Sequence, residues 1–486
     1  MTAVGGGRRH SRAARPERTR DRRKRSSDST ESDSVVSRTP GDVPPAALVH
    51  AMPAMMTSST CLRATSPRME STRRGSLRVV DAAAPARTGA SKTGRSVPRQ
   101  LPRAISAPTT NLGTADAPTP AAGPVPSLRE LRASIPKECF EPDLGESLKY
   151  AAYDLAALAA CFGVISPHVV DHPWLLPLYA PLTGTVMWMN FVVGHDCGHG
   201  SFSKSSVVNG VVGHLTHSPL LVPFYPWAYS HKQHHRFHNH QVKDMSHPWM
   251  TAEEYAEVNP IVRALALDGW WGTFLGFPGY LLLEPRWAGT DGCHFNPQSR
   301  LFDRAPKDER VKCAVSTVAC AAFLGASFVA CDSNPAHWFA QYLAPYLCFS
   351  WWLFTVTYLQ HHDYDTTTYE EGQWEYVLGG LETIDREFGH GVDELTHHIT
   401  DCHVAHHMFS DMPHYRLPAA TAGVRSVLEP RGLYKRRDTR DFVTKVFELH
   451  GDVGHCVESE AGVRPRATRD ECAAAFNGEE WREVRK

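Results

Sequence analysis

Three histidine clusters are the residues of this chain whose types and spacing could do chemistry. The clusters read H-x-x-x-H, H-x-x-H-H and H-x-x-H-H, and their members are His195, His199, His231, His234, His235, His403, His406 and His407. On a helix, residues three and four positions apart lie on one face, so each cluster can direct its imidazoles at a single point. Because neutral imidazole binds iron, copper, zinc and nickel, the spacing predicts a metal site with many nitrogen ligands.

Repetition is what makes these clusters informative. The chain has 27 histidines among 486 residues, so an H-x-x-x-H pair is expected by chance, whereas two copies of H-x-x-H-H are not. Histidines that only cap helices or fill a core would not repeat this spacing. A single zinc ion needs three or four ligands and a water, and eight histidines are too many for it. The 12 cysteines include no C-x-x-C pair, which argues against a zinc ribbon or a disulfide framework.

At these residues the sequence resembles the membrane-bound fatty acid desaturases, and in particular their methyl-end branch. The resemblance is carried by the segments HDCGHGSFS, SHKQHH, TYLQHH and HVAHHMFSDMPHY, and it covers about two thirds of the chain, residues 127–430. It implies that the eight box histidines bind two iron ions, which use dioxygen and two external electrons to remove hydrogen from an acyl chain. Related folds use one or two further nitrogen ligands, for which His361 and His397 are the candidates. One departure is His398, where relatives often have asparagine.

Membrane helices must position these boxes. About 20 apolar residues span a bilayer, and four such runs lie near residues 150–170, 174–193, 311–331 and 338–359. Residues 166–173 are expected to form a turn, which makes the first two runs a hairpin. Two runs separate the second box from the third, so all boxes can meet on one face. The expected fold class is an all-α membrane protein with four main transmembrane helices, interfacial helices, and a cytosol- or stroma-facing cap that carries a histidine-rich di-iron site.

Several polar residues lie in or beside the apolar runs. Asp154 is costly in lipid, so it should face protein or the interface. Asp244 either orients a box histidine from outside the metal site or is an exposed loop acid. The segment 207–222 is too short and too interrupted to span and is expected to lie at the interface; its histidines, His214 and His217, are interpreted as polar interface residues.

The first 126 residues are expected to form a disordered basic leader. The first 25 residues hold ten Arg or Lys, and no hydrophobic periodicity supports a packed core. Leaders rich in Arg and Ser are typical of organelle transit peptides, which favours a plastid membrane. The alternative is a tail that lies on anionic lipid, with the protein in the endoplasmic reticulum membrane. No aromatic platform accompanies the arginines, so nucleic acid is not an expected partner.

The remaining organisation is a desaturase domain over residues 127–430 and a soluble C-terminal tail over residues 431–486, in which residues 442–449 could form a short helix. No H-P-G-G heme signature is present. The resemblance therefore implies a separate electron donor, ferredoxin in a plastid or a b-type cytochrome in the endoplasmic reticulum. It also implies an acyl-lipid or acyl-CoA substrate within the bilayer.

The residues just past the second box bear on regiochemistry. His238-Asn239-His240 looks similar to omega-3 relatives, whereas many delta-12 relatives have a small, polar Asn-Thr-Gly-like stretch there. The expected function is an omega-3 desaturase that converts linoleate to alpha-linolenate. The alternatives are a delta-12 desaturase acting on oleate and an acyl-chain hydroxylase of the same family. A histidine-rich metal transporter is disfavoured, because it would place histidines within spans, whereas these boxes fall at span ends and in loops.

Overall fold

The computed structural model describes residues 123–247, 257–264, 269–283, 292–457 and 463–468. These residues belong to the second of the two units into which the chain divides, Ala107–Lys486. The expected leader lies almost entirely outside the described residues. Within them the chain is mostly helical.

The first long helix covers residues 144–171 without the expected turn. It consists of α2 (Leu144–Ala160), the π-helical η2 (Cys161–Ile165) and α3 (Ser166–Asp171). Pro167 cannot donate a backbone hydrogen bond, but the helix continues because the wider π turn directs the Ser166 amide to the Cys161 carbonyl. The prediction of a turn over residues 166–173 was wrong for this reason, and the chain reverses only around His172.

The second arm of the hairpin is α4 (Leu176–His199), which follows the 3-10 turn η3 (Pro173–Leu175). It packs along α2, α5 (Ser206–His217) and α12 (Ala344–His361). Gly184 permits the close approach of α12, since a Cβ there would lie 2.5 Å from the Cβ of Cys348. The helix ends at Gly200, whose φ of 82° is left-handed and suits glycine. The first histidine box therefore occupies the last turn of a well-packed helix.

Further helices complete the apolar part of the molecule. They are η4 (Ser218–Leu220), α6 (Phe224–Phe237), α8 (Pro260–Val262), α9 (Gly272–Leu282), η7 (Arg300–Phe302), α10 (Asp308–Ala330), α11 (Pro335–Trp338) and η8 (Phe339–Leu343). The segments α11, η8 and α12 follow one another directly and form one helical segment over residues 335–361.

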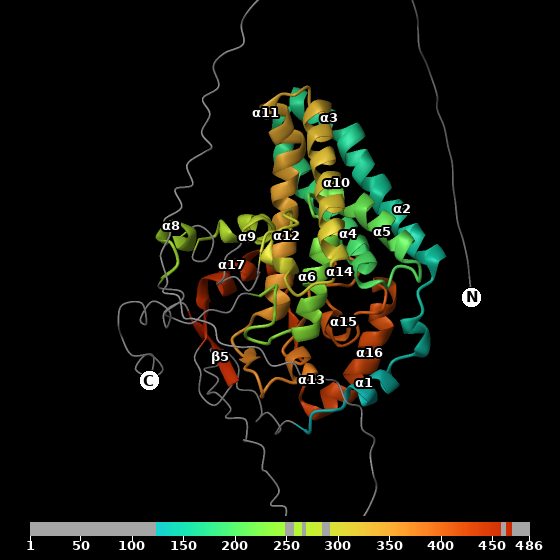
Figure 1. Ribbon diagram of the computed structural model, residues 1–486, viewed down its shortest axis with the longest axis vertical. Helices are drawn as coiled ribbons and strands as arrows, with labels where there is room; N and C mark the ends of the chain where they lie inside the picture. The colour runs from blue at the N-terminus through green and yellow to red at the C-terminus, as the bar shows by residue number, and fades with distance from the viewer. Residues whose placement is uncertain (1–122, 248–256, 265–268, 284–291, 458–462, 469–486) are drawn as a thin grey trace, which may run out of the picture. The chain divides into compact units, whose positions relative to one another are not determined.

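Three helical segments in the described chain are long and apolar enough to cross a membrane. They are Leu144–Asp171, Pro173–His199 and Asp308–Ala330. They coincide with three of the four expected spans. The fourth expected span coincides with residues 335–361, which are helical but are not among these three. The helix α4 packs against both α2 and α12, and α10 contacts α6; Figure 1 shows α10 and α12 running lengthwise through the molecule.

The residues after α12 form a compact region that we call the cap, residues 362–457. Its helices are α13 (Tyr376–Gly380), α14 (Val392–Leu395), α15 (His403–Met408), η9 (His414–Arg416), α16 (Leu417–Leu428), η10 (Glu429–Arg431) and α17 (Phe442–Asp452). Before the first long helix lie α1 (Leu128–Ser134) and η1 (Lys137–Phe140), and α1 packs on α16. In Figure 1, α13, α15 and α16 lie together at one end of the long helices.

Short strands make the fold less purely helical than expected. They are β1 (Thr367–Tyr369), β2 (Asp385–Glu387), β3 (Arg436–Asp438), β4 (Val453–Val457) and β5 (Val463–Thr468). The order β1–β5–β4 is antiparallel, and β2 pairs with β3 in parallel. Hydrophobic periodicity cannot reveal strands of three residues, since such a strand shows barely one alternation.

The main hydrophobic core joins the membrane helices to the cap. Phe349 of α12 and Phe388 after β2 are both fully buried in it. Phe442, Val446 and Leu449 of α17 belong to the same core, and the Phe388 and Phe442 rings stack with centroids 4.3 Å apart. The short helix predicted over residues 442–449 is confirmed, and it packs on the residues that precede it.

Candidate metal centre

Each histidine box lies on a helix that ends at the junction between the long helices and the cap. His195 and His199 occupy the last turn of α4, and the second box lies on α6. The third box begins α15, where the buried carboxylate of Asp385 accepts a hydrogen bond from the Val404 amide at 2.7 Å. These supports hold the boxes on rigid elements, as a precise metal site requires.

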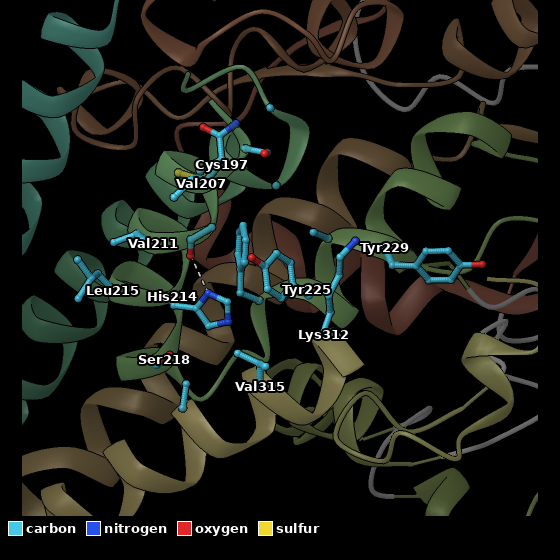
Figure 2. A pocket seen from close by; sticks show the side chains of 18 of the residues that line it. Cys197, Val207, Val211, His214, Leu215, Ser218, Tyr225, Tyr229, Lys312 and Val315 are labelled. Carbon is cyan, nitrogen blue, oxygen red and sulfur yellow. Dashed lines mark hydrogen bonds between the residues drawn. The ribbon is translucent and has the colours of Figure 1, made fainter. Parts of the chain in front are cut away.

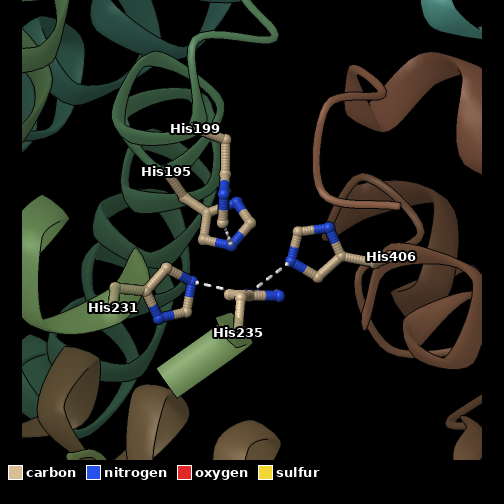
Figure 3. A group of neighbouring side chains, drawn as sticks. All are labelled: His195, His199, His231, His235 and His406. Atoms are coloured by element: carbon tan, nitrogen blue, oxygen red, sulfur yellow. Dashed lines mark hydrogen bonds between the residues drawn. The ribbon is translucent and has the colours of Figure 1, made fainter. Parts of the chain in front are cut away.

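The first group of imidazoles draws on all three boxes. It contains His195, His199, His231, His235 and His406, whose candidate ligand nitrogens all lie within 4.8 Å of one another. Figure 3 shows these five rings converging from α4, α6 and α15. The Nε2–Nε2 distances are 3.2 Å for His195–His199, 3.1 Å for His231–His235 and 3.2 Å for His235–His406.

A second group lies beside the first. It contains His234, His361 and His407, which satisfy the same distance criterion. His403 adjoins this group, because its Nε2 lies 3.1 Å from Nε2 of His361. The structure thus brings the eight box histidines together and adds His361, from the end of α12, as a ninth.

The positions of the imidazole nitrogens suit metal coordination better than they suit hydrogen bonds between the rings. Each imidazole nitrogen carries either one hydrogen or one lone pair, so His235 Nε2 cannot hydrogen-bond well with both His231 and His406. Metal–nitrogen bonds of about 2.0–2.1 Å at angles near 90–110° place neighbouring ligand nitrogens about 3.0–3.4 Å apart. The observed separations lie in this range. Nine imidazoles in two adjoining groups therefore fit two metal ions.

Burial keeps these imidazoles in the form that binds metal. Burial first, and repulsion from neighbouring imidazoles second, lower the pKa of five of them well below the ordinary value: His231, His235, His403, His406 and His407. Burial likewise lowers the pKa of His238, next to this cluster, to about 4. Neutral imidazole is the metal ligand, so the site is ready to bind at neutral pH.

A buried carboxylate orients one box histidine. Asp244 Oδ1 lies 2.7 Å from Nδ1 of His234, which directs Nε2 of that ring toward the second group. Burial alone would raise the pKa of Asp244, but His234 and His247 beside it hold the pKa below the ordinary value. The first of the two readings of Asp244 is thus confirmed. On α4, Asp196 lies 3.7 Å from Nδ1 of His195, too far for a hydrogen bond, and its Oδ2 is instead hydrogen-bonded to the amide and the ring of His414.

His397, the other candidate for an extra ligand, lies outside both groups. Its Nε2 is 2.7 Å from the carboxylate of Asp154, which is 2 % exposed. The prediction that Asp154 faces protein is confirmed, and its partner is this histidine. The neighbouring His398 bonds to Asp401 at 3.1 Å, and these two form a separate small cluster with Cys402.

Sequence reasoning missed two histidines beside the second group. The His247 ring lies 4.4 Å from that of His361, and His238 Nδ1 lies 3.3 Å from His407 Nδ1. In the sequence, His238 was linked only to regiochemistry, and His247 belongs to no motif with the spacing of a helix face. The H-x-x-H step from His235 to His238 was the available signal.

An apolar cavity opens onto both imidazole groups. It has a volume of about 230 Å³ and lies among α4, α9 and α12. Its apolar lining includes Trp188, Phe191, Phe277, Leu353 and Val356, and six of the nine clustered histidines reach it. A cavity lined in this way suits an apolar ligand, which would lie beside the clustered imidazoles.

A larger groove lies behind the first box, between α5, α6 and α10. Its volume is about 1180 Å³, and Val207, Val211 and Leu215 line one side (Figure 2). His214, near its centre, bonds to the Gly210 carbonyl at 2.6 Å and to Ser316 at 3.0 Å. Of the nine clustered histidines, none lines this groove. The groove is therefore separate from the cavity at the metal centre.

A mostly helical chain that has three helices long and apolar enough to cross a membrane, together with nine clustered imidazoles, has the features of a membrane protein that could bind metal. The family model for fatty acid desaturases matches residues 172–439, which hold all three boxes. The chain therefore belongs to the fatty acid desaturase family and is an oxidoreductase.

Three similar proteins show which branch of the desaturase family this chain resembles. The chain is 37% identical over 366 residues to the Delta(12) fatty acid desaturase fat-2 of Caenorhabditis elegans, covering 72% of this chain and 93% of that protein. It is 37% identical over 363 residues to the omega-3 fatty acid desaturase fat-1 of the same organism, covering 72% and 87%. It is 39% identical over 313 residues to the acyl-lipid omega-3 desaturase (cytochrome b5), endoplasmic reticulum, of Arabidopsis thaliana, covering 64% and 78%.

Proposed function

We propose that this enzyme inserts a cis double bond toward the methyl end of an unsaturated acyl chain, at a centre of two iron ions. The single observation that carries the proposal is the convergence of the eight box histidines and His361 beside an apolar cavity. Iron, when bound, supplies the activation of dioxygen and the oxidising power that an unactivated C–H bond requires. Nitrogen-rich ligation suits that metal.

The chain's own residues have three tasks in this reaction. The imidazoles of the two groups hold the metals at a fixed spacing. Trp188, Phe191 and Phe277 enclose the acyl chain and keep water from the reacting carbons. Asp244 keeps the His234 ring turned toward the second group. Together they place two neighbouring methylene groups against the metal centre.

The metal assignment is tested by replacing one histidine from each group. His199→Ala and His407→Ala should each abolish desaturation and lower the iron content of the purified protein. His214→Ala is the matched control, because this histidine lies in the neighbouring groove and contacts none of the clustered imidazoles. Near-normal activity in both box variants would refute the assignment.

For regiochemistry we propose omega-3 rather than delta-12 desaturation. The support is the His238-Asn239-His240 segment, whose first histidine contacts His407 in the second group. Changes at that contact can shift the metals relative to the end of the acyl cavity. The delta-12 alternative is supported because the chain is as similar to the Delta(12) enzyme of Caenorhabditis elegans as to the omega-3 enzyme, at 37% identity to each.

Feeding a host that makes no polyunsaturated fatty acids separates these two activities. The omega-3 proposal predicts that added linoleate becomes alpha-linolenate, while oleate is left unchanged. Formation of linoleate from oleate, with no alpha-linolenate from linoleate, would establish the delta-12 alternative instead.

For location and electron donor, we propose a plastid membrane and ferredoxin, on the strength of the Arg- and Ser-rich leader. The alternative is the endoplasmic reticulum with a b-type cytochrome, the donor that the Arabidopsis relative's name carries. The substrate is an acyl-lipid or acyl-CoA. A fusion of residues 1–126 to a fluorescent protein should label plastids, and labelling of the endoplasmic reticulum or the cytosol would reject the plastid proposal.

A further inference from the structure

The segment that follows the second box is held firmly on both sides. The Trp374 indole donates a hydrogen bond to the His238 carbonyl at 2.9 Å, and the Asn239 side chain donates to the Gly379 carbonyl at 3.1 Å. A Cβ on Gly379 would lie 2.4 Å from the His238 carbonyl oxygen, so only glycine allows this approach. Asn239 adopts a φ of 55°, a left-handed conformation that asparagine tolerates. The His238 ring is therefore placed by four separate features.

The contacts of the His238 ring determine where its hydrogen lies. Its Nε2 is 2.9 Å from the carbonyl oxygen of Tyr376. A carbonyl only accepts, so Nε2 carries the hydrogen. The ring is 0 % exposed, and a neutral imidazole that has its hydrogen on Nε2 has a lone pair on Nδ1. That Nδ1 lies 3.3 Å from Nδ1 of His407, so the His407 nitrogen must be the donor.

The same reasoning fixes the free nitrogen of His407. With its hydrogen on Nδ1, the ring has its lone pair on Nε2. This atom is buried and has no hydrogen-bond partner among the described residues. The carbonyl of Tyr376, the ring of His238 and the ring of His407 thus form a relay that ends in a lone pair available to a metal.

We propose that His238 is a positioning residue that sets the tautomer and orientation of His407 for metal binding, an inference that rests on the metal centre proposed above. Asp244 does the same for His234, since its Oδ1 faces Nδ1 of that ring and its Oδ2 accepts from the Asn239 amide at 3.0 Å. His238 and Asp244 therefore orient two of the three histidines of the second group.

The test compares three variants of the full-length protein in detergent by titrating iron into chelator-treated samples. His238→Ala removes the acceptor, so the second iron should bind about 10- to 100-fold more weakly while the first is unaffected. In His238→Asn, the side-chain oxygen can take the place of Nδ1 and accept from His407, so affinity should recover to within a few-fold. His240→Ala is the matched control, because the His240 ring bonds to Glu371 at 3.0 Å and not to a clustered histidine.

A measurement on the wild type keeps the inference testable even if His238→Ala does not fold. In zinc-loaded protein with 15N-labelled histidine, the His407 signal should have its hydrogen on Nδ1 and its metal on Nε2. Metal on Nδ1, an unchanged second affinity in His238→Ala, or an equal loss in His240→Ala would each overturn the role. A wild type that binds fewer than two metal ions would instead overturn the proposed metal centre, and this role with it.

Discussion

A single buried carboxylate, Asp244, offers a direct test of how the second group is held. Asp244→Asn removes the negative charge that faces Nδ1 of His234, and an amide can present its NH2 to that ring instead. We expect metal affinity at the second group to fall by about 10- to 100-fold, with desaturation falling in step. The measurement is iron per chain and product formed per chain.

Asp303→Asn provides the comparison for that change. The Asp303 side chain is 60% exposed and pairs with Arg310 at the surface, so its substitution should leave iron content and activity unchanged. Equal iron binding by Asp244→Asn and by wild type would contradict the proposed role.

The clustered imidazoles also predict how the metal-free protein responds to pH. In the folded state the pKa values of His231, His235 and His406 lie below the unfolded value of about 6.5. Between the two values the unfolded chain binds more protons, so stability rises with pH in that window. Chelator-treated protein should therefore lose stability as the pH falls below about 6.5.

Denaturant unfolding of the chelator-treated protein at pH 7.5 and pH 5.5 measures this effect. The difference should shrink in a His231→Gln, His406→Gln double variant, because glutamine does not titrate. Stability that is constant or higher at the lower pH would show that these rings are not held neutral.

The sequence indicated the candidate ligands that share a helix, but it did not indicate the histidines that join them only in three dimensions. The spacing of His231, His234 and His235 places them on one side of α6, which local geometry alone dictates. His247 reaches the second group from a loop with no periodicity, so no pattern could signal it. His397 shows the converse, because it stands in a histidine-rich motif but bonds to Asp154.

At the scale of helices, Gly184 tests the packing of α4 against α12. A Cβ at this position would lie 2.5 Å from the Cβ of Cys348 and 2.9 Å from the Phe349 nitrogen. Gly184→Ala should therefore push the helices apart and destabilise the protein by about 1–3 kcal/mol. Thermal unfolding in detergent measures the loss.

Gly325→Ala, in α10, is the matched control. A Cβ at Gly325 meets nothing within 4 Å, and alanine has the higher helix propensity, so stability should be unchanged or slightly raised. If both variants unfolded at the wild-type temperature, the close helix contact would not matter for stability.

The positions of the long helices were easier to predict from the sequence than the residues at which they end. Long apolar runs located the first hairpin correctly, because burial and lipid exposure both select apolar residues. The sequence predicts a turn over residues 166–173, yet the helix continues through Pro167 to Asp171 after the π turn at η2. Whether a proline ends a helix depends on the hydrogen bonding of the preceding turn, which composition does not record.

For the whole molecule, the adjoining imidazole groups require all boxes to lie on one side of the membrane. His235 of α6 and His406 of α15 are 3.2 Å apart, so an even number of spans must separate them. We expect acceptor sites for glycosylation inserted beside Lys243 and beside Arg431 to behave alike. A site beside Ser333, between α10 and α11, should behave in the opposite way, and any other pattern would refute the four-span arrangement.

The distribution of the imidazoles along the chain also has a consequence for biosynthesis. The first group lacks His406, and the second lacks His407, until the ribosome has passed the third box. His199 and His403 are 204 positions apart, a distance that takes about 10–40 s to translate at about 5–20 residues per second. During that interval the early histidines are exposed to any soft metal in the cell while their final partners do not exist. The proposed iron centre therefore predicts that iron is bound only after the third box has been translated, and that chains cut short before residue 403 are not rescued by added iron.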